Sequence, residues 1–154
     1  MNNIIPEIQA DIDFFINLRH QIHQHPEIGF EEKQTSSIVA DLLRKWGYEL
    51  TEGIGVTGMV ATLRSGTGKK VIGIRADMDA LPMQELTDKA WKSKIDNRFH
   101  GCGHDGHTTT LLCAAKYLAE HKTFDGTLHL IFQPAEETLY GGKKMLDDGL
   151  FKKF

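Results

Sequence analysis

Hydrophobic residues recur at helical spacing in four stretches of the chain, two of them before any strand signal. The predicted helices span about residues 7–24, 31–45, 108–120 and 142–148. Pro26 should end the first helix, because the residue before a proline disfavours helical geometry. Gly47 is the expected C-terminal stop of the second helix.

Between these helices the hydrophobic pattern changes to short, β-rich runs. The predicted strands span residues 56–63, 70–76 and 127–132. The run Val71–Ile74 is apolar without alternation, which is typical of a strand covered on both faces. The polar stretch 80–99 is predicted to be a long loop, and such loops are often functional. The order of elements predicts an α/β fold with a mostly parallel sheet flanked by helices.

Composition and charge exclude several classes of protein. The net charge is −3 and no basic run exceeds two residues, so we expect no nucleic-acid partner. No apolar run is long enough to span a membrane, and the N-terminal segment 1–13 lacks the apolar core of a signal peptide. We therefore expect a cytoplasmic protein. With only Cys102 and Cys113, a disulfide framework is not expected.

The densest cluster of potential metal ligands is the segment His100–His107. Five of its eight residues are cysteine, histidine or aspartate, and the other three are glycines, which let the backbone fold tightly. Cys102 and His104, two apart, suit zinc, nickel, cobalt or similar metals. Asp105 and His107 are either outer partners of a metal site or caps of the following helix. The alternative is a glycine-rich turn with incidental histidines.

Two carboxylate pairs follow predicted strands. Asp77 and Asp79 lie where an apolar strand ends, which is where ligands bind in open α/β sheets. Their alternative role is to cap loops or to pair with Arg75. Glu136 and Glu137 repel each other unless a cation lies nearby, and one could then ligate metal while the other accepts a proton from water. On its own this second pair is better explained as a solvated acidic loop or a helix N-terminus. Together, the cluster and both pairs could meet at one edge of the sheet.

Four long motifs, in order along the chain, resemble the hippurate hydrolase and N-acyl-amino-acid amidohydrolase branch of the aminoacylase metallopeptidases. The motifs are Leu18–Glu32, Arg75–Pro82, His100–His107 and Phe132–Glu137. The resemblance implies a two-metal hydrolase using divalent ions such as zinc, manganese, nickel or cobalt. The implied metal ligands are Cys102, His104 and Glu137. Glu136 matches the general base that activates water, and Asp79 the aspartate that helps fix the metal site. Asp77 stands where the wider superfamily has a ligand histidine, and we do not assign it as a ligand.

The resemblance also bears on domain organisation. Family members continue well beyond the position that matches Phe154, so residues 1–154 are expected to be the N-terminal part of an incomplete, zinc-peptidase-like catalytic domain. A lid or dimerisation domain and the remaining catalytic strands would lie elsewhere and supply further histidine ligands. The full-length protein would then be a homodimer or larger assembly, and the partial site in this chain would be open and weak.

The implied reaction is hydrolysis of the amide bond of a small N-acyl amino acid, hippurate-like or N-acetylated. Two alternatives stay open: a non-catalytic α/β fragment with weak or no metal binding, and a dipeptidase or carboxypeptidase of the same superfamily. The histidines His20, His23 and His25 are expected to be structural, because protonated histidine suits a helix C-terminus. Trp91 is expected to pack, or to border a substrate pocket.

Overall fold

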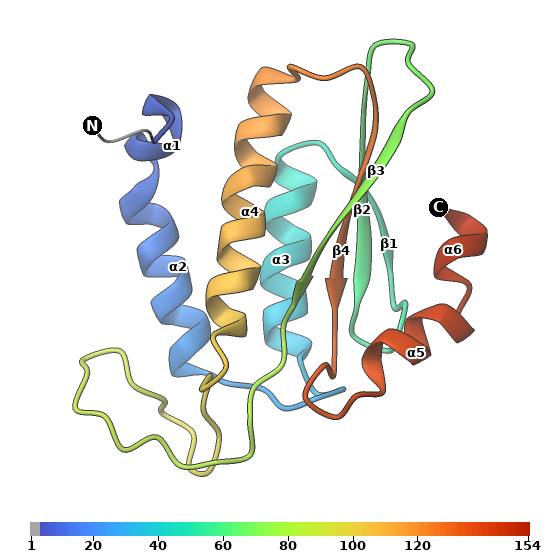
Figure 1. The fold of residues 1–154 in the computed structure, drawn as a ribbon. Coiled ribbons are helices and arrows are strands. Elements are labelled where there is room, and N and C mark those ends of the chain that lie inside the picture. The colour runs from blue at the N-terminus through green and yellow to red at the C-terminus, as the bar shows by residue number, and fades with distance from the viewer. Residues whose placement is uncertain (1–3) are drawn as a thin grey trace.

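The computed structural model describes residues 4–154 (Figure 1). The helices are α1 (Pro6–Ala10), α2 (Ile12–Gln24), α3 (Lys33–Lys45), α4 (His104–His121), α5 (Gly141–Asp147) and α6 (Leu150–Lys153). The strands are β1 (Glu49–Glu52), β2 (Met59–Ser65), β3 (Val71–Asp77) and β4 (Gly126–Gln133). The predicted first helix is divided at Asp11, and β1 and α6 were not predicted. Of the segment 1–13, residues 1–3 lie outside the described range.

The four strands form one sheet in the order β1-β2-β4-β3. The strand β2 pairs antiparallel with β1 and β4, whereas β3 pairs parallel with β4. The α/β class with flanking helices is confirmed, but the sheet is mixed rather than mostly parallel. The reason is the turn after β2, which reverses the chain before β3. Because β4 lies between these two strands and runs parallel to β3, it must run antiparallel to β2.

Helices cover both faces of the sheet unequally. Figure 1 shows α2, α3 and α4 on one face, and α5 and α6 on the other. Alternate residues of β2 divide accordingly: Met59 and Ala61 join the main core beneath α2–α4, and Val60 joins a smaller cluster with Met145 of α5. Within residues 4–154, no helix is both long and apolar enough to cross a membrane.

The strand β3 lies at the edge of the sheet, and its apolar half is exposed. Val71 and Ile72 keep 62% and 59% of their surface accessible. The prediction that this strand is covered on both faces is therefore wrong for the described residues. A continuous apolar run indicates that a strand is suited to burial, but burial also requires covering elements, and none of the described residues cover this edge.

Candidate metal centre

The three groups of potential ligands meet at one end of the sheet, as the sequence predicted. Asp77 is the last residue of β3, and the Glu136–Glu137 pair follows β4. The two strands are parallel, so their carboxyl ends lie side by side. His104 is the first residue of α4, which contacts β3. The helix begins here because Gly103 adopts a φ of 85°, a left-handed conformation suited to glycine.

Cys102, His104 and Glu137 are close enough to share one ion. Each offers a ligand atom, and these atoms all lie within 4.8 Å of one another. The Oε1 atom of Glu137 is buried and has no hydrogen-bond partner among the described residues. A buried carboxylate oxygen without a donor is costly, and a cation would remove that cost. Thiolate, imidazole and carboxylate together suit zinc and similar divalent metals. The residues present therefore fit a divalent metal.

Asp79 fixes the orientation of the His104 ring. The Nδ1 atom of His104 lies 2.9 Å from the backbone oxygen of Asp79 and 3.3 Å from its Oδ1. With the proton on Nδ1, the Nε2 lone pair is left free for a metal. Burial alone would lower the pKa of His104, but the hydrogen bond that its ring donates to Asp79 and the charges of the nearby carboxylates outweigh burial and raise that pKa.

Asp79 also links the ring to the acidic turn after β4. Its Oδ2 accepts the backbone N–H of Glu137 at 2.9 Å. Burial would raise the pKa of Asp79, but the hydrogen bond with His104 and the backbone donors of Glu136 and Glu137 lower it. One ionised carboxylate thus joins two of the three potential ligands.

The neighbouring Glu136 is more open to solvent. Its Oε2 lies 3.8 Å from the Nε2 atom of His104, and its side chain is 36% exposed. The thiol of Cys102 is exposed, and the carboxylates of Glu137 and Glu136 raise its pKa. A carboxylate beside the potential ligands and open to solvent can exchange protons with a water molecule at the site.

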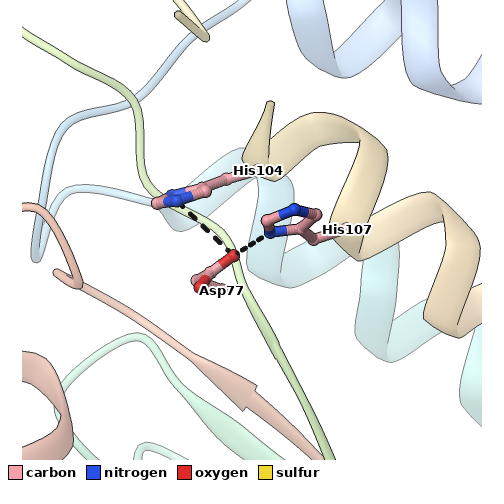
Figure 2. Close-up of side chains that lie close together, drawn as sticks. All are labelled: Asp77, His104 and His107. Carbon is pink, nitrogen blue, oxygen red and sulfur yellow. Dashed lines mark hydrogen bonds and ion pairs between the residues drawn. The ribbon is translucent and has the colours of Figure 1, made fainter. Parts of the chain in front are cut away.

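A second group of possible ligands shares His104. Figure 2 shows Asp77 between the rings of His104 and His107. The Oδ1 atom of Asp77 lies 2.6 Å from Nδ1 of His107 and 3.6 Å from Nε2 of His104. Asp77 also pairs with Arg75 at 3.2 Å, the alternative that its spacing left open. Hydrogen bonds within the protein thus already satisfy Asp77, in contrast to the unpartnered oxygen of Glu137.

A buried network of charged side chains lies behind the site, and its contacts were not predicted. Asp105 is fully buried, and its Oδ2 accepts hydrogen bonds from Arg19 at 3.1 Å and from His23 at 2.8 Å. On its other side, His23 lies 3.3 Å from Glu85 of the long loop. The hydrogen bond with Asp105 raises the pKa of His23, and burial only partly opposes it. Within the described part of the chain, Asp105 makes no side-chain cap bond to α4, and its side-chain partners are Arg19 and His23 rather than a proposed metal ligand. His23 therefore ties the loop to the start of α4.

The long loop docks on α2 as well. The indole of Trp91 stacks on the ring of His20 with centroids 4.1 Å apart, and the backbone N–H of Lys94 donates to Gln24. Leu81 and Phe99 pair at its base. The packing role predicted for Trp91 is confirmed. The contacts with α2 could not be predicted from a local pattern, because the partners lie about seventy residues apart along the chain.

Comparisons with known proteins agree with this geometry. The profile of peptidase family M20/M25/M40 matches residues 73–154. A hippurate hydrolase of Campylobacter jejuni is 57% identical over 99% of this chain, and a thermostable carboxypeptidase of Saccharolobus solfataricus is 43% identical over 97% of it. The chain spans 39% and 38% of these two relatives.

A solved structure supports the same relationship. The crystal structure of the YXEP protein of Bacillus subtilis, described as a dinuclear metal binding peptidase from the M20 family, matches with a TM-score of 0.87. It is 37% identical, and the match covers 92% of this chain and 40% of the other.

Proposed function

Because the chain belongs to peptidase family M20/M25/M40, we propose that the protein is a metal-dependent amidohydrolase that cleaves N-acyl amino acids. One observation carries the proposal: the ligand atoms of Cys102, His104 and Glu137 converge within 4.8 Å, with Glu136 beside them. The similarity to a hippurate hydrolase supports a substrate with a small acyl group on an amino acid.

Each residue at the site has a distinct proposed task. Cys102, His104 and Glu137 would hold a divalent ion, with the full site holding two zinc, manganese, nickel or cobalt ions. Such an ion polarises the substrate carbonyl and makes water acidic enough to react near neutral pH. Glu136 removes a proton from the attacking water. As the carbon–nitrogen bond breaks, Glu136 returns this proton to the departing amine, giving a carboxylate and a free amino acid.

Asp79 completes the mechanism as an orienting residue. Its contacts keep the His104 proton on Nδ1, so that the ring presents Nε2 towards Glu137. We further propose that residues 1–154 form the N-terminal part of the catalytic domain of a cytoplasmic, homodimeric or larger enzyme, whose lid domain and additional ligands lie outside this segment. The shares of the relatives that the chain spans support this organisation.

The general base is tested by Glu136→Gln in the gene product at its natural length. The substitution removes the proton acceptor and leaves the three metal ligands in place, so metal content should be retained and hydrolysis of benzoyl and acetyl amino acids lost. Glu120→Gln, on the exposed side of α4, is the matched control and should leave both unchanged. Normal turnover by Glu136→Gln would exclude the assigned role.

Carboxypeptidase activity is a second candidate, favoured by the 43% identity to the thermostable carboxypeptidase. A panel of dipeptides and N-acyl amino acids sharing the same C-terminal residue separates the two, since only the acyl side then varies. Absence of both metal and turnover from the natural-length protein would instead favour the non-catalytic alternative.

A further inference from the structure

The two site glutamates follow a residue with an unfavourable backbone conformation. Ala135 has a φ of 49°, in the left-handed region that residues with a side chain rarely adopt. Such a conformation persists only where its surroundings fix it. The carbonyl oxygen of Ala135 accepts bonds from Thr138 Oγ1 at 2.9 Å and from the N–H of Gly141 at 3.1 Å. These contacts restrain the carbonyl side of the turn, but not its amide side.

The amide side is held by a carboxylate from a distant segment. Glu32 is fully buried, and its Oε1 accepts the N–H of Ala135 at 2.8 Å. Its Oε2 accepts the hydroxyl of Thr57 at 2.5 Å. Burial raises the pKa of Glu32, although both hydrogen bonds oppose that shift. A fully buried carboxylate is unfavourable without such donors, so its two hydrogen bonds are what make the position tolerable.

The same segment presses on the turn from another side. A Cβ atom at Gly29 would lie 2.9 Å from the Cβ of Ala135 and 3.0 Å from its Cα, so only glycine allows this approach. The backbone oxygen of Glu27 accepts the N–H of Ala80 at 2.8 Å, next to Asp79. The segment 27–32 therefore contacts both strand ends from which the site is built.

We propose that Glu32, supported by the close approach of Gly29, is a positioning residue that fixes the Ala135 turn so that Glu136 and Glu137 face His104. Glu32 acts through the backbone of Ala135 and lies outside the set of metal ligands. The inference rests on the proposed function, in which Glu137 is a metal ligand and Glu136 is the general base. Without the acceptor, the amide of Ala135 is orphaned and the turn can relax out of the left-handed conformation.

Cobalt titration of the protein at its natural length tests this directly, because the proposed full site takes further ligands from outside residues 1–154. Glu32→Leu removes both acceptor oxygens and should weaken Co²⁺ binding by about 10- to 100-fold, the range typical of outer partners. Glu32→Gln keeps one carbonyl oxygen for the amide of Ala135 and should restore binding. Thr57→Val removes only the bond on the far side of the carboxylate and should stay close to the unaltered chain.

The visible spectrum separates positioning from general stability. Glu32→Leu should retain the thiolate-to-cobalt absorption from Cys102, which Glu32 does not contact, while the bands sensitive to ligand geometry change as Glu137 shifts. Circular dichroism and melting temperature, recorded on the same samples, report the fold. A lower melting temperature with an unchanged cobalt affinity and spectrum would overturn the proposal.

A second pair of variants decides the matter if Glu32→Leu does not fold. Gly29→Ala pushes on Ala135 without changing charge and should weaken cobalt binding. Gly142→Ala is the control, because its new Cβ would meet only the end of the Gln133 side chain, at 3.3 Å. Equal binding by both glycine variants overturns the positioning role and leaves the metal centre intact. Failure of the unaltered natural-length protein to bind cobalt overturns the metal centre, and the positioning role with it.

Discussion

The two halves of β3 differ in burial, and the difference shows that a strand is buried only where other elements cover it. The first half, Val71–Ile74, is apolar and exposed, whereas Ala76 and Asp77 at its carboxyl end are buried. The polar end finds its partners in α4 and the turn after β4, both within the described residues. Within residues 4–154, the apolar half pairs with β4 on one edge and has no neighbouring strand on the other. Burial on this strand thus follows the available partners, not the polarity of the side chains.

The largest expected effect comes from two neighbours on this sheet. Ile72 pairs in register with Leu128 of β4, yet Leu128 is only 2% exposed. Leu128→Ala should lower the free energy of unfolding by about 2–5 kcal/mol, because it leaves a cavity in the core. Ile72→Ala should change it by less than about 0.5 kcal/mol. Urea denaturation of both variants measures the difference, and equal losses would show that the β3 edge is covered in solution.

At the polar end of the sheet, loss of the Cys102 sulfur alone should weaken metal binding strongly. Cys102→Ala removes the thiolate from the proposed ligand set and should weaken Co²⁺ binding by more than about 100-fold, beyond the range of an outer partner. Cys113→Ala is the matched control, since this half-buried cysteine packs beside the main core on α4. Isothermal titration of the two variants would contradict the ligand assignment if both bound cobalt alike.

The same contrast explains what the sequence could predict. The His100–His107 segment and the carboxylate pairs were identified because their residue types and spacings are local signals of metal binding, and the parallel ends of β3 and β4 bring them together. The edge position of β3 was not predicted, since strand order depends on which strand β4 joins. Its apolar run indicated suitability for burial and gave no information about partners.

The supporting residues were missed for a related reason. Glu32 and His23 act on residues about a hundred and about eighty positions away, and neither has a distinctive local spacing. A buried glutamate before a helix has the same pattern as an exposed one at a helix N-terminus. The positive φ of Ala135 was equally hidden, because alanine is not a residue type that signals a left-handed turn.

The two aspartates after β3 provide a finer test of the polar end. Asp79→Asn leaves His104 without its charged partner and should weaken metal binding by about 10- to 100-fold. Asp77→Asn should have a smaller effect, because Asp77 is already paired with Arg75 and His107. Cobalt titration ranks the two variants. The reverse order would move the ion towards Asp77, His104 and His107, the group drawn in Figure 2.

The smallest expected effect concerns the ionisation of Glu32, which is buried beside the turn that follows β4. Burial holds the pKa of Glu32 above its ordinary value, so the folded state takes up a proton more readily there than the unfolded chain. The stability that this adds is fully present below the ordinary glutamate pKa, and is lost as the pH rises through the raised folded pKa. The side chain that Glu32→Gln introduces cannot ionise. The free energy of unfolding of this variant should therefore rise relative to that of the unaltered chain as the pH increases from about 4, near the ordinary glutamate pKa, towards neutral.

Urea denaturation at several pH values measures this gain, and every other titrating group cancels because both chains carry it. A difference that does not vary with pH would mean that Glu32 titrates normally and that its two hydrogen bonds offset burial in full. If the variant instead lost stability relative to the unaltered chain as the pH rose, the two hydrogen bonds would favour the ionised form of Glu32. The ionised carboxylate would then stabilise the turn after β4, whereas the apolar half of β3 would remain the part of that strand without sufficient partners.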